Sequence, residues 1–141
     1  MFRSCDLSVR PLTARVGQDE WRLLITARPN VLLEGAQETT NLIVDEAMDW
    51  LPMPHATWTG APPLGDRPAT LVVRSISALD QNQQSLLFEW LESPGDRVQV
   101  ISTTNEPLYA MVGRGAFLAN LYYRLNVLRL DVAKAGASDP H

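Results

Sequence analysis

Hydrophobic residues along the chain fall into two patterns. Three short segments are apolar at nearly every position, which is typical of strands buried on both faces of a parallel sheet. They span residues 31–33, 70–73 and 98–101. Residues 56–59 and 126–132 are weaker strand segments between turn-forming residues. The pattern therefore predicts five strands.

Between these strands, apolar residues recur three or four positions apart, which predicts amphipathic helices. Asp19 and Asp80 are suitable N-terminal caps for the first and third helices, as is Thr39 or Thr40 for the second. Pro107 is expected to open a fourth helix, and residues 117–125 form a fifth. The expected inward-facing residues of the first four are Trp21, Leu24 and Ile25, then Leu42, Ile43 and Ala47, then Leu87, Trp90 and Leu91, and finally Leu108 and Met111.

Strands that alternate with helices favour an α/β fold, in which helices cover both faces of a mostly parallel sheet. A chain of 141 residues is long enough to enclose one such core. We expect a single domain over residues 19–132. Residues 1–18 are expected to form an irregular lead-in, and the small, polar residues 133–141 a flexible tail.

Composition narrows the classes of function. The net charge of −4 disfavours general electrostatic binding to nucleic acid or to an anionic membrane. Lys134 is the single lysine, so chemistry that needs a lysine in the core is excluded. Cys5 has no partner for an intrachain disulfide, and no apolar run is long enough for a membrane helix or a signal peptide. A cytoplasmic protein is therefore expected.

Two segments in the last third of the chain carry a specific motif. Residues 98–105 read V-Q-V-I-S-T-T-N, and residues 117–127 read F-L-A-N-L-Y-Y-R-L-N-V. They resemble the V-I-A-A-T-N and F-R-x-D-L-Y-Y-R-L-N-V segments of the AAA+ ATPase domain in sigma-54-dependent transcriptional activators. Residues 69–76 and 31–35 are similar to that family's Walker B strand and to the strand that enters Walker A. The resemblance implies a three-layer core like that of P-loop NTPases, with a five-stranded sheet.

The residues aligned with Walker A differ from the motif. A Walker A loop, G-x-x-x-x-G-K-[ST], surrounds phosphate with backbone N–H groups, while its Lys supplies charge and its hydroxyl holds Mg²⁺. Here only the first glycine, Gly35, is kept. Thr40 replaces the second glycine, Asn41 the lysine and Leu42 the hydroxyl, and Glu38 adds a negative charge.

The Walker B positions differ as well. Arg74 replaces the metal-binding Asp, and Ser75 replaces the catalytic Glu. Each lost charge-assisted contact is worth about 1.5–3 kcal/mol, so three losses weaken binding by at least about a thousandfold. We therefore expect no catalytic residue, no metal site, no ATP hydrolysis and no cofactor, with ATP binding weak or absent.

Further family positions are changed or kept. Asn105 aligns with the residue that senses the γ-phosphate. Arg124 aligns with a trans-acting arginine finger, and Tyr122 and Tyr123 lie beside it as interface candidates. Residues 56–61 read A-T-W-T-G-A and resemble the sigma-contacting G-A-F-T-G-A loop, but too few residues precede them, so a core strand is favoured. The chain ends where the family continues into a helical lid, and no helix-turn-helix follows, so a lidless core without direct DNA binding is expected.

Arg74 allows two interpretations. In the first, it replaces Mg²⁺ in an anion site at the carboxyl ends of the strands. In the second, which is favoured, it forms a salt bridge with Glu34 or Glu38 that closes the pocket. Asn105 is favoured as a strand-end cap over a sensor, and Arg124 as a structural or interface residue over a catalytic one.

No other group of residues is predicted to form a site. Cys5, His55 and His141 lack metal-ligand spacing, and His55 is expected in an exposed loop. The acidic residues Asp45, Glu46 and Asp49 fit a solvated helix face.

Two hypotheses of different classes follow. The favoured one is a non-catalytic protein-interaction module that keeps part of the ring interface, with a homo-oligomer as one option. Its expected partner is an AAA+ activator or a sigma-54 RNA polymerase component. The alternative is a Mg²⁺-independent nucleotide or anion sensor that uses Arg74. A third possibility is a decayed remnant with no present role.

Overall fold

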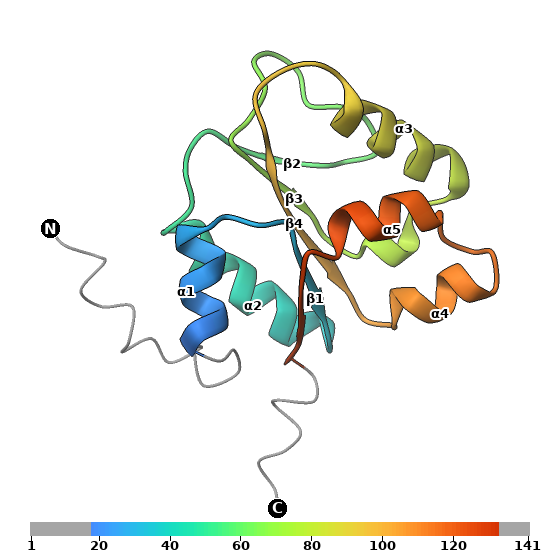
Figure 1. Cartoon of the computed structure of the whole chain (residues 1–141), viewed down its shortest axis with the longest axis horizontal. Coiled ribbons are helices and arrows are strands. Elements are labelled where there is room, and N and C mark those ends of the chain that lie inside the picture. The colour runs from blue at the N-terminus through green and yellow to red at the C-terminus, as the bar shows by residue number, and fades with distance from the viewer. Residues whose placement is uncertain (1–17, 133–141) are drawn as a thin grey trace, which may run out of the picture.

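The computed structural model describes residues 18–132 (Figure 1). The expected lead-in over residues 1–18 lies outside the described residues except for Gln18, which opens α1 instead, and the tail from residue 133 also lies outside them. The elements, in chain order, are α1 (Gln18–Thr26), β1 (Val31–Glu34), α2 (Gln37–Met48), β2 (His55–Thr57), β3 (Thr70–Val73), the 3₁₀ helix η3 (Ile76–Ala78), α3 (Gln81–Glu92), β4 (Gln99–Thr104), α4 (Leu108–Gly113), α5 (Ala119–Leu125) and β5 (Leu128–Asp131).

The five strands form one sheet in the order β2-β3-β4-β1-β5, and every neighbouring pair is parallel. Val31 in β1, an interior strand, pairs with Ile101 in β4 and with Leu128 in β5. The sheet confirms the predicted parallel α/β fold. Because all strands run the same way, their carboxyl ends meet along one edge and their amino ends along the other.

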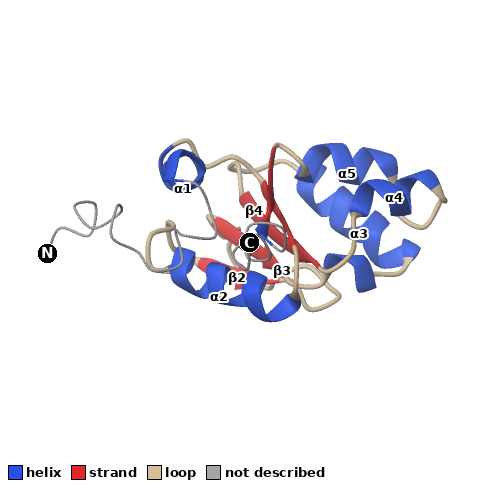
Figure 2. Ribbon diagram, turned by 90° about the horizontal axis from the view of Figure 1, so that it is seen from below, coloured by secondary structure: helices blue, strands red, loops and turns tan. Residues whose placement is uncertain are grey.

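Helices cover both faces of this sheet (Figure 2). Leu32 and Leu33, which are adjacent in β1, point to opposite faces and belong to two separate hydrophobic clusters. Leu33 packs with α1 and α2, whereas Leu32 packs with α3, α4 and α5. The strands are therefore buried on both sides, which explains why their sequences are apolar throughout.

The predicted capping side chains agree with the structure in one case and differ in two. Asp80 caps α3 in a capping box, since its side chain accepts from the Gln83 N–H at 2.8 Å while the Gln83 side chain accepts from the Asp80 N–H at 3.2 Å. The predicted caps of α1 and α2 are wrong. Asp19 lies inside the first turn of α1, and α2 begins before both threonines.

The buried face of α2 differs from the prediction at one residue. Leu42, expected to face inward, is 53% exposed. The buried positions are Thr40, Ile43, Val44 and Ala47, which lie three or four residues apart along one helix face. Leu42 is outside this stripe and faces solvent.

The segment that echoes the sigma-contacting loop belongs to the sheet. Ala56 and Thr57 lie in β2, and Trp58 is buried, with its N–H donating to the Val72 carbonyl at 2.8 Å. This confirms the interpretation as a strand of the sheet, although β2 lies at the sheet's edge and its residues are not buried. His55 opens β2, is half-buried and places Nε2 3.0 Å from the Leu51 carbonyl, so the expectation of an exposed loop position was wrong.

Among residues 18–132, no helix is long and apolar enough to span a bilayer.

Candidate functional site

The residues that the sequence aligns with a nucleotide site gather at the carboxyl edge of the sheet. Gly35 follows β1, Arg74 follows β3 and Asn105 follows β4. The connection after β1 crosses one face of the sheet, and the connection after β4 crosses the other (Figure 1). Such a point between neighbouring strands is where open parallel α/β sheets bind ligands. The fold therefore puts these residues at the expected location.

The backbone between β1 and α2 is short. The Gly35 N–H donates to the Thr104 carbonyl at 2.9 Å, which joins the ends of β1 and β4. Helix α2 starts at Gln37, and the Thr40 N–H already donates to the Ala36 carbonyl at 3.0 Å. The Thr40 side chain is buried and donates to the Gln37 carbonyl at 3.1 Å. Within the segment aligned with Walker A, only Gly35 and Ala36 are therefore outside the helix.

Arg74 is held by two side chains of α2. Its guanidinium donates to Asn41 Oδ1 at 2.8 Å and to Asp45 Oδ1 at 2.9 Å. Asn41 and Asp45 are four residues apart, so they share one face of the helix. The side chains of Arg74 and Asp45 are 35% and 65% exposed, so water screens their attraction.

The predicted salt bridge of Arg74 is present, but its predicted acidic partners were wrong. Glu34 instead accepts from the Leu108 N–H through Oε2 at 3.3 Å and pairs through Oε1 with Arg129 at 3.5 Å. Its buried carboxylate thus fixes the start of α4. Glu38 lies two turns before Asp45 in the exposed first turn of α2. The sequence signal for this role of Glu34 was its position as an acidic residue at the end of an apolar strand.

The remaining positions at this edge are Ser75 and Asn105. Ser75 adopts a left-handed conformation, with φ of 53°, and its N–H donates to Thr103 Oγ1 at 2.8 Å. The strand-end cap predicted for Asn105 belongs to Thr104, whose hydroxyl accepts from the Glu106 N–H at 3.2 Å and donates to the Glu106 carbonyl at 2.7 Å. Asn105 itself is exposed.

A cavity of about 130 Å³ lies beside Gly35 and Asn105. Three carboxylates line it, from Glu34, Glu106 and Asp131, and this charge disfavours an anionic phosphate. No group of three or more His, Cys, Asp or Glu in the described part of the chain could hold a metal ion. The prediction that Cys5 and His141 lack such a role lies outside the described residues.

The interface candidates on α5 have three different environments. Tyr122 is buried, its hydroxyl accepts from Asn126 Nδ2 at 3.0 Å, and burial raises its pKa above 10.0. Tyr123 is 65% exposed, and its ring contacts that of Tyr122 at 5.2 Å. Arg124 pairs with Glu92 and donates to the Leu91 carbonyl at 3.0 Å. Tyr123 is thus the residue of the three most open to a partner.

Comparison with known proteins places this arrangement in a family. The profile of the sigma-54 interaction domain matches residues 32–134, from β1 through the last strand. The chain belongs to the sigma-54 interaction domain family. This confirms the resemblance found in residues 98–105 and 117–127. No curated protein matches the chain significantly.

Solved structures share the fold of this sigma-54 interaction domain. NtrX from Brucella abortus in complex with ADP matches 92% of the chain at 15% identity, with a TM-score of 0.65. The same protein in complex with ATP matches 88% at 16% identity, with a TM-score of 0.67. The P-loop NTPase domain of the sigma-54 transport activator from E. coli matches 75% of this chain and 97% of its own, at 20% identity and a TM-score of 0.52. The chain spans 38% and 37% of the two NtrX chains.

Proposed function

We propose that this sigma-54 interaction domain is a non-catalytic protein-interaction module that modulates a sigma-54-dependent activator or a related regulator. The observation that carries the proposal is the contact of Arg74 with Asn41 and Asp45. Arg74 and Asn41 occupy the aligned positions of the metal-binding Asp and the phosphate-binding Lys. In this chain the Arg74 guanidinium donates to the Asn41 side chain, and Asp45 neutralises the charge of Arg74.

The backbone supports the same conclusion. A Walker A loop holds phosphate because several successive N–H groups point inward around it. Here the N–H of Thr40 is used within α2, and helix replaces the loop from Gln37 onward. A loss of ATP hydrolysis would therefore be caused by the main chain as well as by the side chains.

The alternative, a Mg²⁺-independent anion sensor that uses Arg74, receives less support. An incoming anion would have to displace Asp45 from Arg74 and would lie near the acidic cavity beside Gly35. The NtrX relatives were solved with ADP and with ATP, so nucleotide binding is the property to test first.

The first experiment is an ATP titration followed by calorimetry, in excess Mg²⁺ and again in EDTA. We expect no saturable heat in either buffer. Binding that needs Mg²⁺ would overturn the proposal, and binding that survives EDTA but is lost in Arg74→Ala would support the sensor.

A second variant separates side chains from backbone. Asn41→Lys combined with Arg74→Asp restores the two charges of the aligned motifs. We expect it to remain unable to bind Mg-ATP, because α2 still begins at Gln37. Circular dichroism would confirm that the variant is folded. Recovery of binding would show that the side chains alone were responsible.

The interaction itself is tested with purified partners. The domain is titrated against a sigma-54-dependent activator and, separately, against sigma-54. We expect binding to an activator that Tyr123→Ala weakens. The control is Leu23→Ala, which removes an apolar side chain that is 48% exposed on α1, over the other face of the sheet. Absence of binding to both proteins would contradict the proposal.

A further inference from the structure

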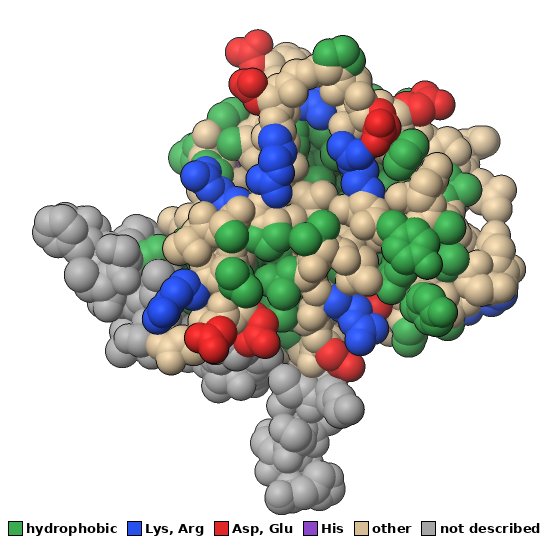
Figure 3. Space-filling view, viewed as in Figure 1, with side chains coloured by type: hydrophobic (Ala, Val, Ile, Leu, Met, Phe, Trp, Pro, Cys, Tyr) green, Lys and Arg blue, Asp and Glu red, His purple; other side chains and the backbone are tan. Residues whose placement is uncertain are grey.

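A cavity lined mainly by polar side chains lies at the opposite edge of the sheet from Gly35, Arg74 and Asn105. Its volume is about 380 Å³. It is lined by Asn30 just before β1, by Val98 just before β4, and by Arg124 near the end of α5. Figure 3 shows Arg side chains gathered around a hollow in this face of the molecule. We call it the amino-edge cavity.

The charge of this cavity differs from that of the chain. Arg67, Arg97 and Arg124 line it, against two acidic residues, Glu92 and Asp96. The whole sequence has 12 basic and 16 acidic residues. Three arginines from distant parts of an acidic chain thus converge on one cavity with a positive balance, and such a site attracts anions.

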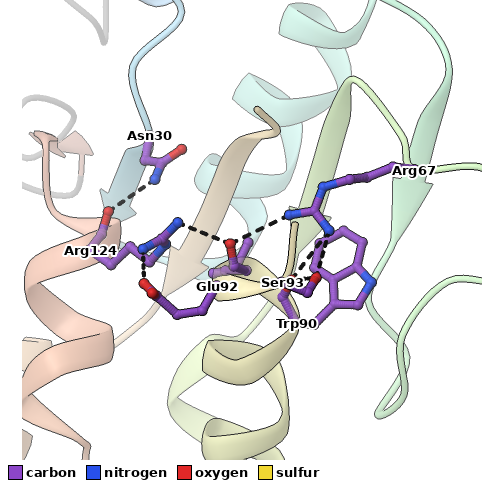
Figure 4. A network of polar contacts seen from close by, with 7 residues as sticks. Asn30, Arg67, Trp90, Glu92, Ser93 and Arg124 are labelled. Carbon is purple, nitrogen blue, oxygen red and sulfur yellow. Dashed lines mark hydrogen bonds and ion pairs between the residues drawn. The ribbon is translucent and has the colours of Figure 1, made fainter. Parts of the chain in front are cut away.

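Arg67 forms a fixed wall of the amino-edge cavity (Figure 4). Its Nε donates to the Asp96 carbonyl at 2.9 Å, and its Nη1 donates to Ser93 Oγ at 3.0 Å and to the Trp90 carbonyl at 3.2 Å. The guanidinium also lies 4.5 Å from the centre of the Trp90 ring. A Cβ at Gly95 would lie 2.8 Å from Arg67 Cδ, so only glycine leaves room for this side chain.

Arg124 is oriented from the other side. The Asn30 side chain donates to the Arg124 carbonyl at 2.9 Å, while the Arg124 guanidinium pairs with Glu92 and donates to the Leu91 carbonyl (Figure 4). Arg67 also donates to the Leu91 carbonyl, at 3.4 Å. Two guanidinium groups are therefore held at the C-terminus of α3, where the helix dipole favours positive charge.

Arg97 is the least engaged of the three arginines. It is exposed, and within residues 18–132 its guanidinium donates only to the Arg28 carbonyl. A guanidinium has five N–H donors. Arg97 therefore brings available donors and a full positive charge to a cavity whose other arginines are already ordered.

We propose that the amino-edge cavity binds a small oxyanion, a phosphate or a carboxylate group, with Arg97 and Arg124 as its ligands. Arg67 is not a ligand, because most of its N–H donors are already used. It orders the wall of the cavity and contributes positive charge. Glu92 occupies Arg124 in the free protein, and the anion takes the place of that carboxylate. This site goes beyond the proposed function, because it uses none of the residues that gather at the carboxyl edge of the sheet.

The test uses inorganic phosphate and succinate as probes, each titrated into the full chain at constant ionic strength with chloride as the reference. Amide chemical shifts of the loop that contains Gly95 and Asp96 report binding. We expect a saturable response to at least one probe, and the preferred probe identifies the chemical class. Arg97→Ala should weaken binding about tenfold or more, since a charge-assisted contact is lost.

Glu92→Gln gives the opposite expectation. It removes the competing carboxylate without removing bulk, so binding should become several times tighter. Arg114→Ala, which removes an arginine that pairs with Glu106 outside the cavity, should leave binding unchanged. A response equal to that of chloride, or one unaffected by both Arg97→Ala and Glu92→Gln, would overturn the proposal. None of these outcomes depends on ATP or on a protein partner, so failure here leaves the proposed function intact.

Discussion

Arginine side chains lie beside a cavity at both edges of the sheet, but the groups that bind these arginines differ in charge. At the carboxyl edge, Arg74 is neutralised by Asp45, and three carboxylates line the nearby cavity. At the amino edge, Arg124 pairs with Glu92, but Arg67 is bound by neutral carbonyl and hydroxyl oxygens, which leave its charge in place. The location that a parallel sheet offers for ligands is thus not the location where this chain keeps positive charge.

The contrast has a physical origin in the partners. A carboxylate cancels the field of a guanidinium, whereas a carbonyl orients the guanidinium without removing its charge. The carbonyls at the end of α3 act in this second way. Changes at the two edges should therefore differ in size and in salt dependence.

The largest effect is expected for Arg67→Ala at the amino edge. The variant loses the hydrogen bonds to the end of α3 and the contact with Trp90. The free energy of unfolding should fall by about 2–4 kcal/mol, measured by urea denaturation. Arg67→Lys should recover only part of this, because lysine cannot form several hydrogen bonds in fixed directions. A loss below about 1 kcal/mol would show that the network contributes little.

Gly95→Ala should be smaller, at about 1–3 kcal/mol. Gly95 has φ of 144°, and the added Cβ would meet Arg67. In the double variant with Arg67→Ala the collision is absent. The double variant should therefore lose less free energy of unfolding than the two single variants lose together. Full additivity would mean that backbone strain alone sets the cost.

At the carboxyl edge, Arg74→Ala should lower the free energy of unfolding by no more than about 1 kcal/mol, because both partners are partly exposed. The loss should shrink further in high salt. Arg114→Ala is the matched control, since its ion pair with Glu106 is similarly exposed. A loss at Arg74 as large as that at Arg67 would remove the distinction between the two edges.

The smallest effect concerns alkaline pH. Burial raises the pKa of Tyr122 above 10.0 in the folded state, so the unfolded chain releases this proton first as the pH rises. Ionisation of Tyr122 therefore leaves the free energy of unfolding unchanged below about pH 10. The free energy of unfolding falls as the pH rises through and above that value. Denaturation measured from pH 9 to 11 should show a shallower fall for Tyr122→Phe. Tyr123→Phe, with an exposed ring, is the control; an unchanged slope in Tyr122→Phe would contradict the expectation.

The amino-acid sequence by itself determined the elements and the family. Apolar runs placed β3 at Thr70–Val73, and Asp80 with Gln83 marked the start of α3. The motif in residues 117–127 pointed to the sigma-54 interaction domain. These features were predictable because propensity, capping and burial patterns act over a few neighbouring residues.

The start of α2 was harder to predict. Ala36 precedes α2 and makes no side-chain cap, so nothing in the local sequence marked Gln37 as the first helical residue. The threonines that looked like caps lie inside the helix. The hydrogen bond from the Gly35 N–H to the Thr104 carbonyl fixes the end of β1 in the sheet, and α2 begins two residues after Gly35.

The tertiary structure alone decided the charge partners and the amino-edge cavity. Arg74 met Asp45 instead of Glu34 because α2 packs along the sheet within reach of Arg74, while Glu34 contacts the start of α4. Arg67, Arg97 and Arg124 are far apart in sequence and converge only when the parallel strands align their amino ends. Electrostatic contacts depend on distance in space, and the distances between remote residues are set by the packing of the whole sheet.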